Sequence, residues 1–247
     1  AAGEHMAEMR LIAEPALQAD LRQAQVGVLD QQLGPREALV LHENGARISW
    51  TYDDLSARAA EVARALIACG SGRDERIGIL MSNRPEWVSA CFGISLAGGV
   101  AVGLSTFSTP DELAALLEIS GVSTLLVERH VAGKDFAEML GGLDLGRFPF
   151  LARVVVLGAS QFESWEQFLA RGKAVDPAMV EARAAAVTPA DAALIFFSSG
   201  STGRPKGIVN AHRGVIIQSW RWARIYTMSA DDHVRTWAPN GLFWSGN

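Results

Sequence analysis

The chain has 247 residues, of which 49% are hydrophobic and 20% are charged, and its formal net charge is −5. This composition argues against disorder and indicates a globular protein that is long enough to bury a sizeable core. The negative net charge provides no basic surface for nucleic acid, so nucleic-acid binding is not expected. Cys69 and Cys91 lack the spacing of a metal or redox site, and we expect buried free thiols.

The N-terminal region lacks a secretory signal, because residues 1–20 contain no continuous apolar core. We interpret residues 1–9 as a cloning remnant followed by a disordered start. The uncharged stretch Trp87 to Pro110 is long enough to span a membrane. However, Gly98 and Gly99 divide it, and its second part is β-like, so a buried helix followed by a buried strand is the better interpretation. We therefore expect a soluble, cytoplasmic protein without a membrane span.

The first predicted element is a β-hairpin. Two short runs, residues 38–41 and 47–50, flank Asn44 and Gly45, and this dipeptide is a strong signal for a tight turn between strands. Thr51 follows as the N-cap of an amphipathic helix.

Further along the chain, short apolar strands alternate with helices. We predict strands over residues 76–81, 100–104, 123–127 and 153–157. The first helix of this region is expected to begin at Asn83 and Pro85, and the later helices cover residues 110–120, 134–140 and 164–171. This order is typical of βαβ units, so the predicted fold class is α/β, with doubly wound, mostly parallel sheets and flanking helices.

The Ala-rich stretch Glu181 to Asp191 has two interpretations. It is either a boundary between two lobes or a helix that ends at Pro189 within one domain. On the first interpretation, residues 10–187 form an α/β lobe with the N-terminal hairpin. Residues 188–247 then form the start of a second, incomplete α/β lobe.

The strongest functional signal lies between Ile195 and Lys206. An apolar run, Ala192 to Phe197, predicts a buried strand, and a run of small residues follows it. Their backbone N–H groups can turn toward one point, while hydroxyls and a lysine add donors and positive charge, which makes an anion site. The predicted phosphate-binding residues are Ser198, Ser199, Gly200, Ser201, Thr202, Gly203 and Lys206.

This loop differs from the P-loop of nucleoside triphosphatases, which needs a hydroxyl after the lysine and then a helix. Here Gly207 follows Lys206, and residues 208–210 predict a strand. The order of strand, Ser/Thr/Gly loop, Pro-Lys-Gly and strand instead resembles the signature of the adenylate-forming superfamily. That superfamily contains acyl-CoA synthetases, peptide-synthetase adenylation domains and luciferases. A Ser/Gly-rich surface linker is the alternative, but strands this apolar do not usually flank a linker.

Two other segments extend the resemblance. Ser105 to Leu113 looks like the strand-to-helix junction of acyl-CoA synthetases. Peptide-synthetase adenylation domains typically have a Leu-Pro-[Ile/Leu]-Asp-Pro type sequence at that junction, and this chain does not. Ala238 to Gly246 resembles a motif that borders the acyl pocket in the superfamily, with Trp244 where relatives often have His or another aromatic residue. Trp244 is therefore a candidate substrate contact; packing in a core is the alternative.

The resemblance implies the N-terminal portion of the large domain of an adenylate-forming enzyme, most like an acyl-CoA synthetase. The implied activity is that of an ATP-dependent carboxylic acid–CoA ligase, with ATP, Mg²⁺ and CoA as cofactors and a small carboxylic acid as substrate. Lys206 is the expected catalytic residue, as a positive charge near the departing pyrophosphate; it could instead merely orient the loop. His212 matches a frequent family histidine, for which we expect a structural role.

Several family elements would lie beyond Asn247, including the acidic residue linked to Mg²⁺ and the domain with a second catalytic lysine. No metal ligand is therefore assigned in this chain, and we expect the chain alone to be inactive. A homodimer is left open. Two alternative functions also stay open, namely another adenylate-forming enzyme, carrier-loading or luciferase-like, and a phosphate-binding module without catalysis.

Overall fold

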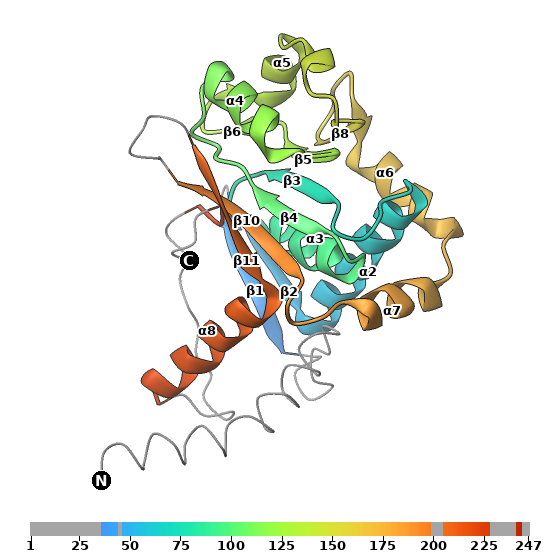
Figure 1. Ribbon diagram of the computed structural model, residues 1–247, viewed down its shortest axis with the longest axis vertical. Helices are drawn as coiled ribbons and strands as arrows, with labels where there is room; N and C mark the ends of the chain where they lie inside the picture. The colour runs from blue at the N-terminus through green and yellow to red at the C-terminus, as the bar shows by residue number, and fades with distance from the viewer. Residues whose placement is uncertain (1–35, 44–45, 199–204, 228–240, 244–247) are drawn as a thin grey trace.

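The computed structural model describes residues 36–43, 46–198, 205–227 and 241–243 (Figure 1). A seven-stranded sheet occupies its centre. In spatial order, its strands are β11 (Lys206–Ala211), β10 (Ala192–Ser198), β4 (Val100–Gly103), β3 (Arg76–Leu80), β5 (Thr124–Glu128), β8 (Arg153–Leu157) and β9 (Glu163–Ser164). All neighbouring strands are parallel except β10 and β11. The predicted mostly parallel α/β sheet is thus confirmed.

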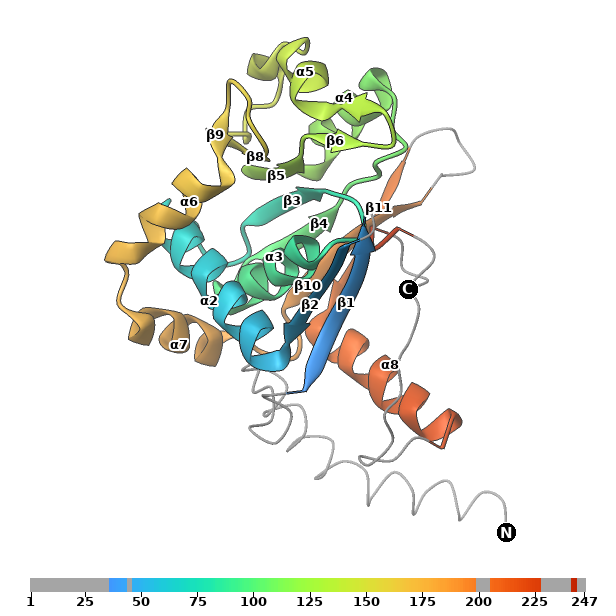
Figure 2. The same cartoon turned by 180° about the vertical axis from the view of Figure 1, so that it is seen from behind.

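Helices cover both faces of this sheet. The α-helices are α2 (Tyr52–Ala68), α3 (Pro85–Leu96), α4 (Pro110–Ser120), α5 (Phe136–Gly141), α6 (Trp165–Arg171), α7 (Pro177–Ala186) and α8 (His212–Ile225). Two short 3₁₀ turns are η1 (Leu145–Arg147) and η2 (Gly172–Ala174). Two hairpins stand apart from the main sheet, namely β1 (Glu37–Glu43) with β2 (Ala46–Thr51), and β6 (His130–Val131) with β7 (Lys134–Asp135). Figure 2 shows the first hairpin beside α2 and α3.

The two faces of the sheet carry separate apolar cores, because successive strand residues point to opposite sides. In β3, Ile77 and Ile79 pack with α2, α3, α6 and α7, whereas Leu80 packs with α4 and α5. The same alternation holds in β5, where Leu126 belongs to the first core and Leu125 to the second. Helices on both faces make this a doubly wound arrangement, as predicted.

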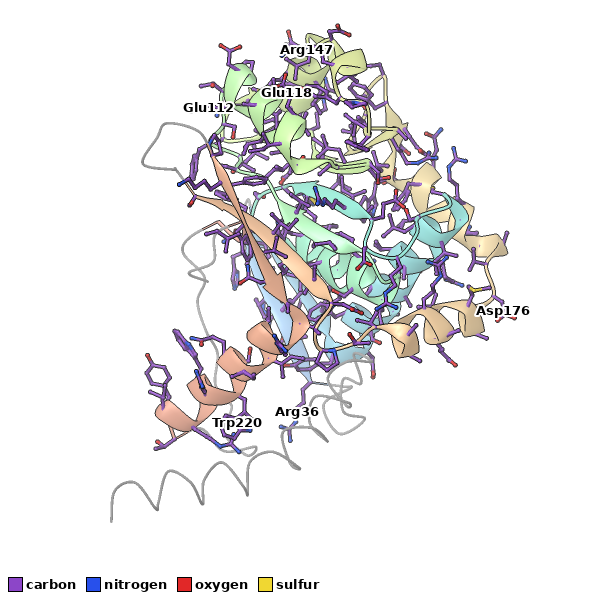
Figure 3. The ribbon with its side chains drawn as sticks, in the orientation of Figure 1. Arg36, Glu112, Glu118, Arg147, Asp176 and Trp220 are labelled. Carbon is purple, nitrogen blue, oxygen red and sulfur yellow. The ribbon has the colours of Figure 1, made fainter. Side chains whose placement is uncertain are left out.

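Local capping explains where the helices begin. Thr51 and Thr109 each accept a hydrogen bond from the backbone three residues later, and an acidic residue reciprocates, which forms a capping box. Gly121 ends α4 in the left-handed conformation that favours glycine. On the surface, Glu118 of α4 pairs with Arg147 of η1 (Figure 3). Both views of the ribbon show α8 directed away from the sheet (Figures 1 and 2).

Two details differ from the sequence predictions. The N-cap of α3 is Arg84, with Pro85 at the first helical position, and Asn83 lies outside the helix. Lys134 lies in β7 and the helix starts at Phe136, because Asp135 caps it with hydrogen bonds to two backbone N–H groups. Neither difference is visible in the apolar periodicity on which the boundaries were predicted.

The stretch between the two predicted lobes contains the end of α7 at Ala186, followed by β10. β10 pairs in parallel with β4, so the described residues after position 188 extend the same sheet. The division into lobes stays a prediction. Trp87 to Pro110 forms α3 and β4, as interpreted, and no described helix is both long and apolar enough to cross a membrane. Cys69 and Cys91 are free and partly buried, and burial raises the pKa of the Cys91 thiol to about 12.

Candidate functional site

The candidate site lies where the parallel strands β3, β4, β5 and β10 end. Because these strands are parallel, their carboxyl ends meet at one edge of the sheet, which we call the carboxyl edge. After β3 the chain enters α3 on one face, and after the adjacent β4 it enters α4 on the other face. In open α/β sheets, ligands bind in the crevice that forms where neighbouring connections diverge in this way.

The predicted phosphate loop leaves from this edge. Ser198 is the last residue of β10 and is paired with Lys206, the first residue of β11. The hairpin therefore brings the two ends of the predicted loop together, and both residues are exposed. Residues 199–204, with five of the predicted phosphate ligands, lie outside the described residues. So does the predicted substrate contact Trp244.

A buried carboxylate fixes the turn that follows β3. Glu128, at the end of β5, is 7% exposed and accepts hydrogen bonds from the Ser82 N–H and from the Arg84 guanidinium, both at 2.8 Å. Arg84 also binds Glu86 at 2.7 Å. Burial works against the charge of Arg84, but the two carboxylates outweigh it and raise the pKa of that guanidinium. This network holds the residue between Ser82 and Arg84, which is Asn83, at a fixed place on the carboxyl edge.

The turn that follows β4 is held in place by the side chain of Lys134, which lies in β7. The Lys134 ammonium donates hydrogen bonds to three successive carbonyl oxygens, those of Thr106, Phe107 and Ser108, over 3.3, 2.7 and 3.0 Å. Thr106 and Ser108 are buried, whereas the Phe107 side chain is largely exposed. The turn thus presents an aromatic ring at the carboxyl edge on a rigidly held backbone.

The segment Gly241–Phe243 lies against both turns. The Leu242 N–H donates to the side-chain oxygen of Asn83 over 2.8 Å. Phe243 is only 4% exposed, and its ring meets the Phe107 ring edge to face, with the centroids 5.9 Å apart. A groove of about 440 Å³ lies beside this segment; it is lined by residues 38–42 of β1 together with Asn83, Arg84, Pro85, Val88 and Leu242.

His212 lies away from this site. It begins α8, directly after β11, and the pairing of Ala192 with Ala211 places it near the start of β10. β11 has six residues, so His212 is about 20 Å along the strand from Lys206. Burial lowers the pKa of His212, and the charge of Asp191 opposes that shift. His212 thus lies at a helix start, and its structural role stays a prediction.

Sequence reasoning missed several residues of the site. These are Asn83, Phe107 and Lys134, which were assigned to a helix start, a strand-to-helix junction and a helix, without a role at the carboxyl edge. No local pattern identifies them, because each acts on a segment that is distant in the sequence. Asn83 and Leu242 are 159 positions apart. Among the described residues, no three His, Cys, Asp or Glu side chains gather as a metal site would require.

Comparison with known proteins agrees with this arrangement. The profile of the AMP-binding enzyme family matches residues 29–245. A methyl-dioxo-octahydroindenyl-propanoyl:CoA ligase from Mycobacterium tuberculosis is 35% identical over 205 residues, which are 83% of this chain and 39% of the relative. A 3-hydroxybenzoate/4-hydroxybenzoate–CoA ligase from Thauera aromatica is 30% identical over 221 residues, 88% of this chain and 39% of the relative. This chain therefore spans about two fifths of the length of these relatives.

Solved structures share the fold. The anthranilate CoA ligase AuaEII in complex with anthranoyl-AMP matches with a TM-score of 0.66 at 24% identity, over 82% of this chain and 36% of that structure. The N-terminal domain of FACL13 from Mycobacterium tuberculosis matches with a TM-score of 0.66 at 21% identity, over 90% of this chain and 50% of that structure. The resemblance inferred from the phosphate loop is confirmed. The chain belongs to the family of AMP-binding enzymes.

Proposed function

We propose that the intact protein is an ATP-dependent carboxylic acid–CoA ligase. In the first step, ATP and the acid give an acyl-adenylate and pyrophosphate. In the second step, the CoA thiol displaces AMP and forms the thioester. One observation carries the proposal. The two ends of the predicted phosphate loop, Ser198 and Lys206, lie at the same edge of the sheet as the Gly241–Phe243 segment. The names of the relatives as CoA ligases support it.

Each part of the edge then has a role. Ser198 to Gly203 would bind the β- and γ-phosphates through backbone N–H groups and hydroxyls. Lys206 would place a positive charge near the pyrophosphate as it departs, where fixed charges stabilise the transition state most. Trp244, which follows the anchored Phe243 directly, would contact the acid. The residues that hold the phosphates and the acid would thus converge from neighbouring strand ends.

The residues of this chain suit ATP better than they suit Mg²⁺. ATP fits a loop with small residues and a lysine, whereas the described residues hold no cluster of acidic or histidine ligands for Mg²⁺. Mg²⁺ would therefore depend on the phosphates and on residues outside the described part. The two free cysteines suit the reducing cytoplasm, in which we place the protein. The homodimer stays open.

The test is an assay of the intact protein with ATP, Mg²⁺ and a panel of aromatic and alicyclic carboxylic acids. We expect acid-dependent pyrophosphate release, and AMP release that depends on CoA. Acyl-AMP that forms without CoA-dependent AMP release would instead favour a carrier-loading or luciferase-like enzyme. ATP binding without pyrophosphate release for every acid would favour a phosphate-binding module.

A further inference from the structure

We propose that Asn83 and Gly103 are positioning residues, which together hold the Gly241–Phe243 segment on the carboxyl edge and thereby set the affinity for the carboxylic acid. The part of this proposal that concerns the acid rests on the proposed function. The part that concerns the segment rests on contacts alone. The two residues come from the ends of adjacent strands, β3 and β4, and they act by different physical means.

Asn83 acts through a hydrogen bond. Asn83 lies one position before Arg84, which is the N-cap of α3, so Asn83 does not occupy the capping position of that helix. The oxygen of Asn83 instead accepts from the Leu242 N–H over 2.8 Å. Glu128 accepts hydrogen bonds from the Ser82 backbone N–H and from the Arg84 guanidinium, so both neighbours of Asn83 are tied to the end of β5. Asn83 therefore offers a fixed acceptor to a segment that is far away in the sequence.

Gly103 acts through the space that it leaves. A Cβ atom built at Gly103 would lie 3.1 Å from the Phe243 Cα and 3.2 Å from the Phe196 ring, closer than such atoms normally approach. The backbone of Gly103 has no left-handed conformation that would need glycine for another reason. The missing side chain therefore serves the close approach of Phe243. β4 and β10 together form a seat for this segment.

The segment is also shaped to its seat. The Phe243 ring folds back over Gly241, where a Cβ atom would lie 2.1 Å from the ring. The ring also meets the Phe107 ring in an edge-to-face contact, and Lys134 holds the backbone of Phe107. Leu242 and Phe243 directly precede Trp244, the proposed contact with the acid, in the sequence. Loss of either anchor should therefore change the acid site more than the phosphate loop, which leaves from β10.

The direct test is hydrogen exchange of the Leu242 amide, measured by mass spectrometry with residue-level fragmentation on the intact protein. Asn83→Leu keeps the size of the side chain and removes the acceptor, whereas Asn83→Asp keeps an acceptor oxygen. We expect exchange at Leu242 to become at least about tenfold faster in Asn83→Leu and to stay within about threefold of wild type in Asn83→Asp. Equal exchange in wild type and Asn83→Leu would overturn the proposal, whatever the activity.

Kinetics on the same proteins test the functional part. We expect Asn83→Leu and Gly103→Ala to raise the KM for the acid about tenfold or more while the KM for ATP stays within about twofold. Asn83→Asp should restore the acid KM. Gly214→Ala is the matched control, because a Cβ atom there would meet nothing within 4 Å. Parallel rises in both KM values, or no rescue by Asn83→Asp, would overturn the positioning role.

The two proposals can fail separately. If wild-type protein forms no thioester with any acid while Asn83→Leu still speeds exchange at Leu242, the proposed function is wrong and the anchoring of the segment is supported. If wild-type protein forms thioester and the variants match it in exchange and in acid KM, the ligase function stands and the positioning role is wrong. Should Asn83→Leu fail to fold, Gly103→Ala provides the same two readouts.

Discussion

The ammonium group of Lys134 lies 2.7 Å from the carbonyl oxygen of Phe107, at the centre of three consecutive hydrogen bonds to the turn after β4. Lys134 belongs to the small β6–β7 hairpin, which follows β5 on the far side of β3 from β4. The contact therefore joins the connection that follows β5 to the connection that follows β4. It ties the aromatic ring at the carboxyl edge to a second part of the fold.

We predict that Lys134→Met lowers the free energy of unfolding by about 1.5–3 kcal/mol, because the charged donor is lost from three carbonyl oxygens, two of them on buried residues. Urea unfolding followed by circular dichroism measures this change. Lys173→Met is the control, since Lys173 is exposed and makes no hydrogen bond among the described residues. A loss no greater than that of the control would contradict the role of this contact.

Replacement of Gly93, the single glycine of α3, is predicted to destabilise the protein. A Cβ atom at this position would lie 2.6 Å from the Val62 Cβ and 2.7 Å from the Ala59 carbonyl oxygen, so α2 and α3 could not stay at their present separation. We expect Gly93→Ala to cost about 1–3 kcal/mol through overpacking, measured as the shift of the urea midpoint. Gly214→Ala in α8 should cost nothing, since that position is open. Equal stability of both variants would show that the helix pair adapts freely.

A third prediction concerns acid stability. Burial acts to raise the pKa of Glu163, but hydrogen bonds from Arg171 and Arg153 outweigh it and hold that pKa below its ordinary value of 4.5. Below pH 4.5 the unfolded chain therefore binds a proton that the folded chain resists. The contribution of Glu163 is complete above pH 4.5, and it is lost as the pH falls through the lowered value.

Urea unfolding at pH 7, 4.5 and 3.5 tests this sign. Wild type should lose stability between pH 4.5 and 3.5, and Glu163→Gln should start from a lower stability at pH 7 and lose less over that interval. Glu181→Gln, on the exposed side of α7, is the control and should follow wild type. A pH profile of Glu163→Gln that runs parallel to wild type would refute the assignment.

The sequence predicts well those parts of the fold that depend on local patterns. The strand that leads to the phosphate loop is visible as the apolar run Ala192 to Phe197, and the predicted N-cap Thr51 is the N-cap of α2. The four parallel strands of the βαβ region were found because each contains a short apolar run. The two-residue strands β6, β7 and β9 were missed, because two residues carry no periodicity.

Contacts between distant segments could not be predicted in this way. The placement of β10 beside β4 depends on pairings such as that of Leu194 with Ala101, and no local pattern encodes them. Asn83 shows the same limit at the site. Its position before Pro85 suggested a helix start, whereas its side chain is used by Leu242. The sequence thus predicts a phosphate loop, whose role stays a prediction, and it does not indicate the residues that contact the Gly241–Phe243 segment.

Two single substitutions in the intact protein separate the ends of β11. Lys206→Ala should slow adenylate formation by about a hundredfold while it weakens binding of the acid far less, because its charge is needed mainly as pyrophosphate departs. His212→Asn, at the other end of the same strand, should leave the rate within about threefold of wild type. Single-turnover acyl-AMP formation and equilibrium binding of the acid give the two quantities. Equal losses in rate and in acid binding for Lys206→Ala would assign Lys206 a structural role instead.

The last prediction concerns the chain by itself. It spans about two fifths of the CoA ligases it matches, 39% in two of them. Adenylate formation and thioester formation require groups on both sides of the substrate, and closure of a mobile element often gates such chemistry. The described residues supply one edge of the proposed site, namely Ser198 and Lys206 at the two ends of the predicted phosphate loop and the contacts that hold the Gly241–Phe243 segment.

We therefore expect the 247-residue chain alone to give neither acid-dependent pyrophosphate release nor CoA-dependent AMP formation above background. The assay should include the intact protein as a positive control and the chain with Lys206→Ala as a blank for contaminating enzymes. Turnover by the chain that disappears in the Lys206→Ala blank would contradict this expectation, because it would place all the groups needed for the reaction within these residues.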